Sequence, residues 1–189
     1  PVPIVDTEGT IAFADFIYYP ERPYDDAIPY HHARELGITD YRGQIVFEGG
    51  NFQTDGQGRC YVTQGLYQEN GITAEELDAR LRDYLNCQTM VVLQPLKGEG
   101  TTHIDMFFKL VSPTRALLGR YAESDDLANA KILEDNLARL MAVDLGGGAR
   151  LEVIRIPMPP HTPEAGSSEK VWRTYTNSTM VYPVNIWPV

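Results

Sequence analysis

The chain has 189 residues, of which 43% are hydrophobic and 22% charged, a composition typical of one folded domain and unlike a disordered or collagen-like segment. Its formal net charge is -10 and its Lys and Arg residues form no cluster, which disfavours binding to nucleic acid or to an anionic membrane surface. No apolar run approaches the roughly 18 residues of a membrane helix, and the two cysteines form neither a CxxC motif nor a Cys/His cluster typical of zinc sites.

The first half of the chain alternates between β-type and helical patterns. Aromatic and β-branched residues predict strands over residues 9–19, 44–48, 59–64 and 89–93. A first helix is expected over residues 25–36, with Asp25 or Asp26 as N-cap and Gly37 at its C-terminal end. Thr73 and Glu76 have capping-box spacing and begin a second helix.

The second half continues in the same way. Residues 103–111 and 115–118 flank a turn and predict a β-hairpin. A long helix follows, capped by Ser124 and ending near Met141. Further strands are predicted over residues 150–156 and 174–182, with a Pro- and Ser-rich loop between them.

This order contains a repeated pattern. Residues 44–93 and residues 103–156 each read as strand, strand, helix, strand, although the two copies share little sequence identity. Repeated ββαβ units predict an α/β fold built from modules arranged around a centre.

Three polar residues stand out as candidates for chemistry. His103 and Asp105 are two residues apart on a predicted strand, so their side chains should leave the same face. Glu48 ends a strand just before two glycines. Each of these placements is also common in purely structural settings. One His with two carboxylates is a poor ligand set for a transition metal, so acid/base chemistry is the preferred interpretation. His31, His32 and His161 are expected to face solvent.

Several motifs, in this order and spacing, resemble one known family. They are EGGNF at residues 48–52, DGQG at 55–58, THID at 102–105 and YTNS at 175–178, preceded by YYPERPYDD at 18–26. The sequence resembles the agmatine deiminase and bacterial, Porphyromonas-type peptidylarginine deiminase family of the guanidine-modifying (pentein) superfamily. The resemblance covers most of residues 9–189.

The resemblance implies a partial α/β-propeller and a deiminase that hydrolyses a guanidinium carbon through a cysteine thioether intermediate. It implies that His103 is the general acid/base, that Asp105 binds the guanidinium nitrogens and that Glu48 pairs with the histidine. It further implies substrate-binding roles for Asn177, Asn51 and Arg22, although Pro20 occupies a position near Arg22 that is Arg in some relatives. Paired carboxylates suit a planar, cationic guanidinium. No metal or cofactor is expected.

The departures from the family pattern concern the nucleophile and the ends of the chain. Neither Cys60 nor Cys87 matches the family's catalytic cysteine, which is expected outside this chain. We therefore expect residues 1–189 to form a single catalytic-type domain that lacks the N- and C-terminal modules of the family fold. The expected partners are a small guanidinium substrate or peptidyl-arginine, and the remaining segments of the same protein.

Two other functions stay open at this point. The chain is either the enzyme described above, a non-catalytic relative that binds arginine-like ligands, or an amidinotransferase-like enzyme. The choice among agmatine, arginine and peptidyl-arginine also stays open, as does the compartment, cytoplasmic or secreted, because two cysteines are compatible with either.

Overall fold

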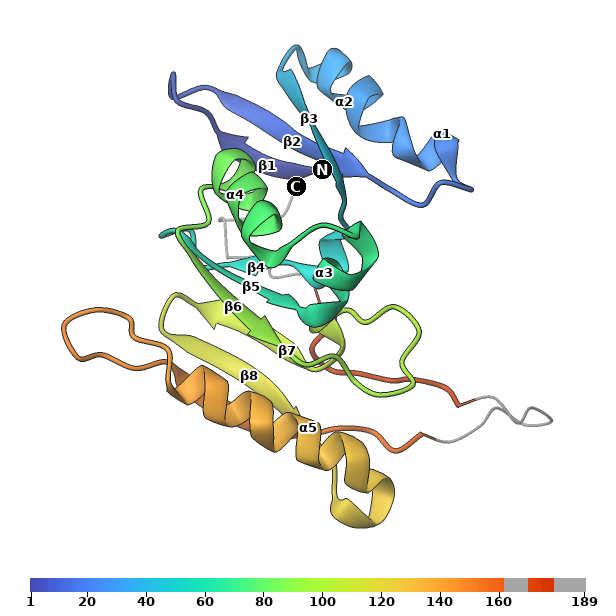
Figure 1. The fold of residues 1–189 in the computed structure, drawn as a ribbon, viewed down its shortest axis with the longest axis vertical. Coiled ribbons are helices and arrows are strands. Elements are labelled where there is room, and N and C mark those ends of the chain that lie inside the picture. Colours follow the sequence, from blue (N-terminus) through green and yellow to red (C-terminus); the bar gives the residue numbers. More distant parts are fainter. Residues whose placement is uncertain (162–169, 179–189) are drawn as a thin grey trace, which may run out of the picture. The chain divides into compact units, whose positions relative to one another are not determined.

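The computed structural model of this protein describes residues 1–161 and 170–178, which divide into two compact units, Pro1–Ile104 and Asp105–Val189 (Figure 1). Within these residues the first unit contains two three-stranded sheets and the second contains one. None of the helices in the described ranges is both long enough and apolar enough to cross a bilayer.

The first sheet has the order β1-β2-β3. Strand β2 is antiparallel to β1 and parallel to β3, so the helices that join β2 to β3 form a crossover. Strand β2 is almost completely buried, which explains its run of apolar and aromatic residues. The elements are β1 (Val2–Val5), β2 (Ile11–Ile17), α1 (Pro23–Asp26), α2 (Ile28–Leu36) and β3 (Thr39–Val46).

The second sheet has the order β4-β5-β6 and repeats this topology. Its longer helix has a local sequence signal at each end. Thr73 and Glu76 form the predicted capping box at the N-terminus, and Asn86, in the left-handed conformation, ends the helix. The elements are β4 (Gln53–Thr54), β5 (Arg59–Thr63), α3 (Gln64–Asn70), α4 (Ala74–Leu85) and β6 (Thr89–Leu93).

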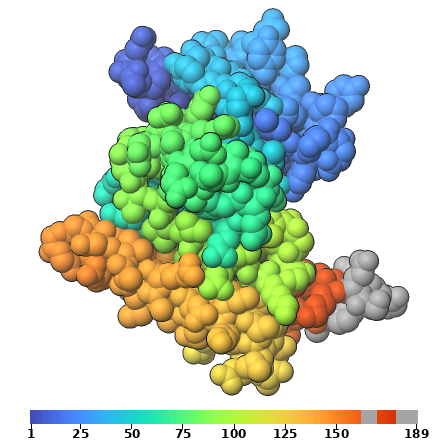
Figure 2. Space-filling model, viewed as in Figure 1, coloured from blue at the N-terminus to red at the C-terminus, as the bar shows by residue number. Residues whose placement is uncertain are grey.

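The third sheet, in the second unit, has the order β7-β8-β9, again with an antiparallel pair followed by a parallel partner. Helix α5 forms the crossover, and its outer face lies on the molecular surface (Figure 2). The elements are β7 (Phe108–Ser112), β8 (Arg115–Arg120), α5 (Glu123–Met141) and β9 (Glu152–Pro157).

The ββαβ repeat is therefore confirmed, but one boundary in the sequence-based prediction was wrong. Residues 44–46 belong to β3, which closes a first module, rather than opening the second. The second module opens instead with the two-residue strand β4. An apolar pattern shows that a strand exists but not which neighbour it pairs with, so a third copy over residues 2–46 was missed.

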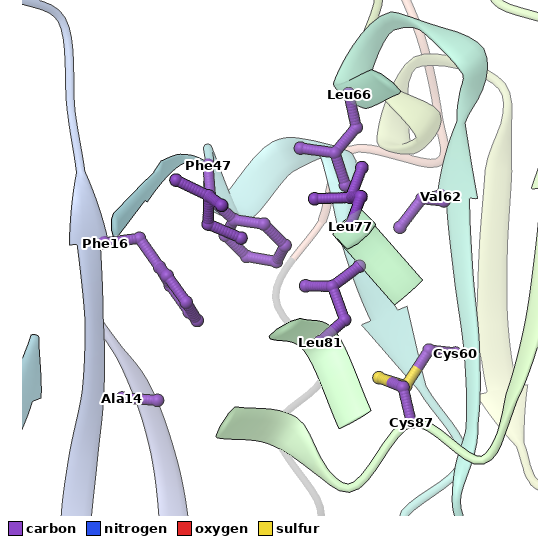
Figure 3. Close-up of a cluster of buried hydrophobic side chains, with 10 residues drawn as sticks. Ala14, Phe16, Phe47, Cys60, Val62, Leu66, Leu77, Leu81 and Cys87 are labelled. Carbon is purple, nitrogen blue, oxygen red and sulfur yellow. A yellow bond between two sulfur atoms is a disulfide. The ribbon is translucent and has the colours of Figure 1, made fainter. Parts of the chain in front are cut away.

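The core of the first unit contains the two cysteines. Cys60, in β5, and Cys87, just after α4, form a disulfide within a cluster of buried apolar side chains (Figure 3). Phe16, Leu77 and Leu81 belong to the same cluster. The bridge therefore joins the crossover helix of the second module to its sheet, a link that the sequence analysis did not predict.

Helix starts were predicted less well than helix positions. The expected helix over residues 25–36 is divided at Ala27, and neither Asp25 nor Asp26 caps it. Asp26 instead accepts a hydrogen bond from the Tyr18 backbone and pairs with Arg42. In α5 the backbone of Asp126 is non-helical. The Asp126 carboxylate, rather than the predicted cap Ser124, accepts a hydrogen bond from the backbone N–H of Asn129.

Two predictions in the second unit were wrong. Residues 174–178 contain a bend at 175–177 and no strand, while residues 179–182 lie outside the described ranges. His161, expected to face solvent, has a side chain only 5% exposed. Its ring lies 4.0 Å from that of Trp172 and 4.9 Å from that of Tyr121. His31 and His32 are exposed on α2, as expected.

The buried His161 predicts a pH-dependent stability. Burial lowers its pKa; Asp126, whose Oδ2 lies 3.3 Å from Nε2, opposes this effect, and Lys170 adds to it. Below about pH 6.5 the unfolded chain therefore binds a proton that the folded chain does not, so the free energy of unfolding should fall as the pH drops through this region. Denaturant titrations at about pH 7.5 and about pH 5.5 measure this difference.

The variant His161→Gln should reduce the loss of stability between the two pH values. His31→Gln, a change at an exposed histidine, should leave it as in the wild type. An undiminished loss in His161→Gln would show that other groups cause the acid sensitivity.

Candidate active site

The centre of the site in the first unit is a contact between Glu48 and His103. Glu48 follows β3 and precedes the 3-10 turn Gly49–Asn51. Its Oε2 lies 2.6 Å from Nε2 of His103, and the two side chains are 8% and 17% exposed. The sequence analysis expected this pairing from the family resemblance. A carboxylate is an acceptor only, so at this distance it orients the ring by accepting the hydrogen on Nε2.

Tyr19 completes this cluster and was missed by sequence reasoning. Its hydroxyl donates to the same Oε2 of Glu48 at 2.5 Å. Burial, and then the hydrogen bond to Glu48, raise the pKa of Tyr19, so the phenol remains a donor at neutral pH. Ile17 of β2 is paired with Val46 of β3, and the two strands are parallel. Tyr19 and Glu48 each come two residues after this pair, so they leave neighbouring strands at the same end of the sheet. Knowledge of that register would have identified Tyr19.

Glu69, on α3, adds negative charge to this region. Its pKa is raised, first by burial and then by the charge of Glu48, while His103 acts in the opposite direction. The first unit thus gathers two carboxylates, a phenol and an imidazole, an arrangement suited to a cationic ligand and to proton transfer.

The imidazole is held in place by small and strained backbone positions. A Cβ atom on Gly50 would overlap Nδ1 of His103, so glycine is required for the ring to lie here. Thr102, directly before His103, has a left-handed φ of 58°, which is uncommon for a β-branched residue. Its carbonyl accepts a hydrogen bond from Thr63 Oγ1 at 2.7 Å, which helps to hold that conformation.

Asn51 supports the same loop. Its side chain is buried, and its Oδ1 accepts a hydrogen bond from the Thr63 backbone at 2.9 Å. Through Thr63, Asn51 is therefore connected to the residue that precedes His103. This geometry favours a supporting role for Asn51 over the direct substrate contact that the resemblance implies.

Asp105 lies in a 3-10 turn, Ile104–Met106, and not on a strand. The expectation that His103 and Asp105 share one face of a strand was therefore wrong, because β7 begins only at Phe108. Within the second unit, the Asp105 carbonyl accepts a hydrogen bond from Thr176 Oγ1 at 2.7 Å. Asn177 comes directly after Thr176 in the chain, and its side chain is exposed.

Arg22 lies at the start of α1 and is exposed. Its guanidinium is 2.5 Å from the carboxylate of Asp25 and lies over the ring of Tyr18, at 5.2 Å from the ring centroid. Arg22, Tyr18 and Gly49 all line a cavity of about 380 Å³ in the first unit. The ion pair with Asp25 gives Arg22 a bracing role that does not require substrate.

Neither cysteine of the chain is available as a nucleophile. Cys60 and Cys87 are bonded to each other, so neither carries a free thiol. Among the described residues, no group of three or more His, Cys, Asp or Glu side chains is placed to hold a metal ion.

Comparisons with known proteins agree with this picture. A curated relative from Selenomonas ruminantium, provisionally named an agmatine deiminase, is 27% identical over 148 residues, which cover 75% of this chain and 40% of the relative. The agmatine deiminase structures from C. jejuni and Enterococcus faecalis share the fold, with TM-scores of 0.74 and 0.73 at 17% and 22% identity.

These alignments cover 93% and 88% of this chain but only 51% and 50% of the two solved structures, so the chain spans about half the length, or less, of the proteins it matches. Residues 9–189 match the family described as Porphyromonas-type peptidyl-arginine deiminase. With its three β-β-α-β sheets and its Glu48–His103 pair, the chain belongs to that family.

Proposed function

We propose that this chain provides the acid/base and guanidinium-binding part of a deiminase that acts on agmatine, arginine or peptidyl-arginine. The observation that carries the proposal is the 2.6 Å contact between Glu48 and His103 in a largely buried site. The names of the matched relatives support the reaction class.

The site residues would act in two half-reactions. A cysteine thiolate from outside residues 1–189 adds to the guanidinium carbon, His103 donates a proton to the departing nitrogen, the C–N bond breaks and ammonia leaves. His103 then removes a proton from water, the water oxygen adds to the carbon of the thioether, and the C–S bond breaks to restore the thiolate. The product carries a ureido group in place of the guanidinium.

The remaining residues would prepare these steps. Glu48 holds the Nε2 hydrogen of His103 and leaves Nδ1, beside Gly50, as the nitrogen that exchanges protons. Asp105 would bind the guanidinium nitrogens and Asn177 would contact the same substrate. Arg22 would lie at the edge of the site. The charge of a carboxylate matches the paired N–H donors of the substrate.

The proposal extends to the architecture. We infer that residues 1–189 are one catalytic-type domain of a partial α/β-propeller, completed by further segments of the same protein. The three repeated modules support this arrangement, as does the match to about half of the solved relatives.

The test compares the isolated chain with the longer protein. The isolated chain should release no ammonia from agmatine, arginine or a peptidyl-arginine substrate, because both of its cysteines are bonded. A protein that also contains the segment with the reactive cysteine should release ammonia, and His103→Ala should reduce that rate by about 10²- to 10⁴-fold.

Two results would argue against this proposal. Ammonia release by the isolated chain, abolished by His103→Ala, would show that no outside cysteine is needed. No release from any of the three substrates by the longer protein would favour a non-catalytic, arginine-binding relative, the alternative that fits the lack of a free thiol.

A further inference from the structure

The segment that carries Asn177 is held by side chains rather than by a sheet. Residues 170–178 contain no strand, so within the described part of the chain no ladder of backbone hydrogen bonds fixes their position. A substrate-binding side chain must nevertheless be held within a fraction of an ångström to act. The position of Asn177 therefore depends on the anchors on either side of it.

The first anchor is Thr176, whose side chain is completely buried. Its Oγ1 donates to the Asp105 carbonyl at 2.7 Å. A hydroxyl carries one hydrogen, so Thr174, at 2.7 Å, must donate to Thr176 Oγ1, while Thr174 Oγ1 accepts from the Thr176 backbone at 3.0 Å. The Thr176 hydroxyl thus has a defined orientation towards Asp105.

The second anchor lies on the other side of Asn177. The ammonium of Lys109, on β7, donates to the carbonyl of Ser178. Both neighbours of Asn177 are thus bonded to the short stretch between Asp105 and Lys109. The asparagine and the aspartate are far apart in sequence, yet the two anchors connect their backbones within the second unit.

From this geometry we infer that Thr176 is a positioning residue that holds Asn177 and Asp105 in a fixed relation for binding the guanidinium group. The inference rests on the proposed function, which assigns both side chains to substrate. Without the hydroxyl the Asp105 carbonyl loses this hydrogen bond, and of these two anchors the Lys109 contact remains.

The test uses the longer, active protein with Thr176→Val, which has nearly the same shape without the hydroxyl, and Thr176→Ser, which retains it. Thr176→Val should raise KM for the guanidinium substrate roughly tenfold, as expected for the loss of one well-formed hydrogen bond, with a smaller change in kcat. Thr176→Ser should restore KM to within about twofold of the wild type. Thr114→Val, the same change at an exposed turn of this unit, should have no effect.

Two further arms keep the test decisive. Hydrogen exchange should become faster at residues 105–107 and 176–178 in Thr176→Val, a measurement that needs no activity. If Thr176→Val fails to fold, Lys109→Met removes the second anchor and should also raise KM.

An unchanged KM and unchanged exchange in Thr176→Val, or no rescue by Thr176→Ser, would overturn the inference. If Asp105→Asn is inactive while Thr176→Val resembles the wild type, only the positioning role fails. If the wild-type protein shows no turnover, the proposed function fails, and the exchange data still decide whether the anchor exists.

Discussion

Replacing Asp105 with Ala or Asn in the longer, active protein should lower kcat/KM for guanidinium substrates by roughly 10²- to 10³-fold while the protein remains folded. Removing one partner from a desolvated charge pair costs about 2–5 kcal/mol, most of it because the other charge is left without compensation. The backbone carbonyl of Asp105, which Thr176 holds, is unaffected by a side-chain change, so the turn Ile104–Met106 should persist.

Steady-state kinetics and thermal unfolding of the same samples measure this effect. Asp135→Ala, at an exposed position on α5, is the matched control and should retain wild-type kinetics. Normal turnover by Asp105→Ala would show that Asp105 does not bind the substrate.

The second large effect concerns stability. The double variant Cys60→Ala, Cys87→Ala should lower the free energy of unfolding by about 3–4 kcal/mol, because a cross-link over a sequence separation of 27 restricts the unfolded chain by about that amount. The bridge lies in the core of the first unit, between α4 and its sheet, so the loss should be confined to that unit.

Denaturant titrations with and without a reductant check this prediction. Wild-type protein in reductant should approach the stability of the double variant, and the double variant should not respond to the reductant. Equal stability of the oxidised wild type and the double variant would mean that the bridge does not restrict the unfolded chain.

The cluster of Glu48, His103 and Tyr19 shows how much sequence reasoning can predict. Glu48 and His103 were identified from motifs, and the structure brings them into contact. Tyr19 carries no such signal, because an aromatic residue at the end of a strand reads as ordinary β-propensity. Only the register of β2 with β3 places the Tyr19 hydroxyl near Oε2 of Glu48, the oxygen that also contacts His103.

The buried polar groups of the second unit illustrate the same limit. Both Ser124 and Asp126 are good N-cap residues, and the choice of Asp126 depends on where the backbone can turn. His161 lies beside a Pro- and Ser-rich segment and looked exposed. Its burial depends on Trp172 and Tyr121, which approach it only in the folded chain.

The sequence by itself determined the family, the alternation of strands and helices, and local helix boundaries such as the Thr73–Glu76 capping box that begins α4. Each of these depends on neighbours within a few residues or on motifs read along the chain. Tertiary structure alone decided the pairing of β3 with β2, the bond between Cys60 and Cys87, and the anchoring of Thr176 on Asp105. These contacts join residues that are distant in sequence, and their partners are selected by packing and by the satisfaction of buried polar groups across the whole fold.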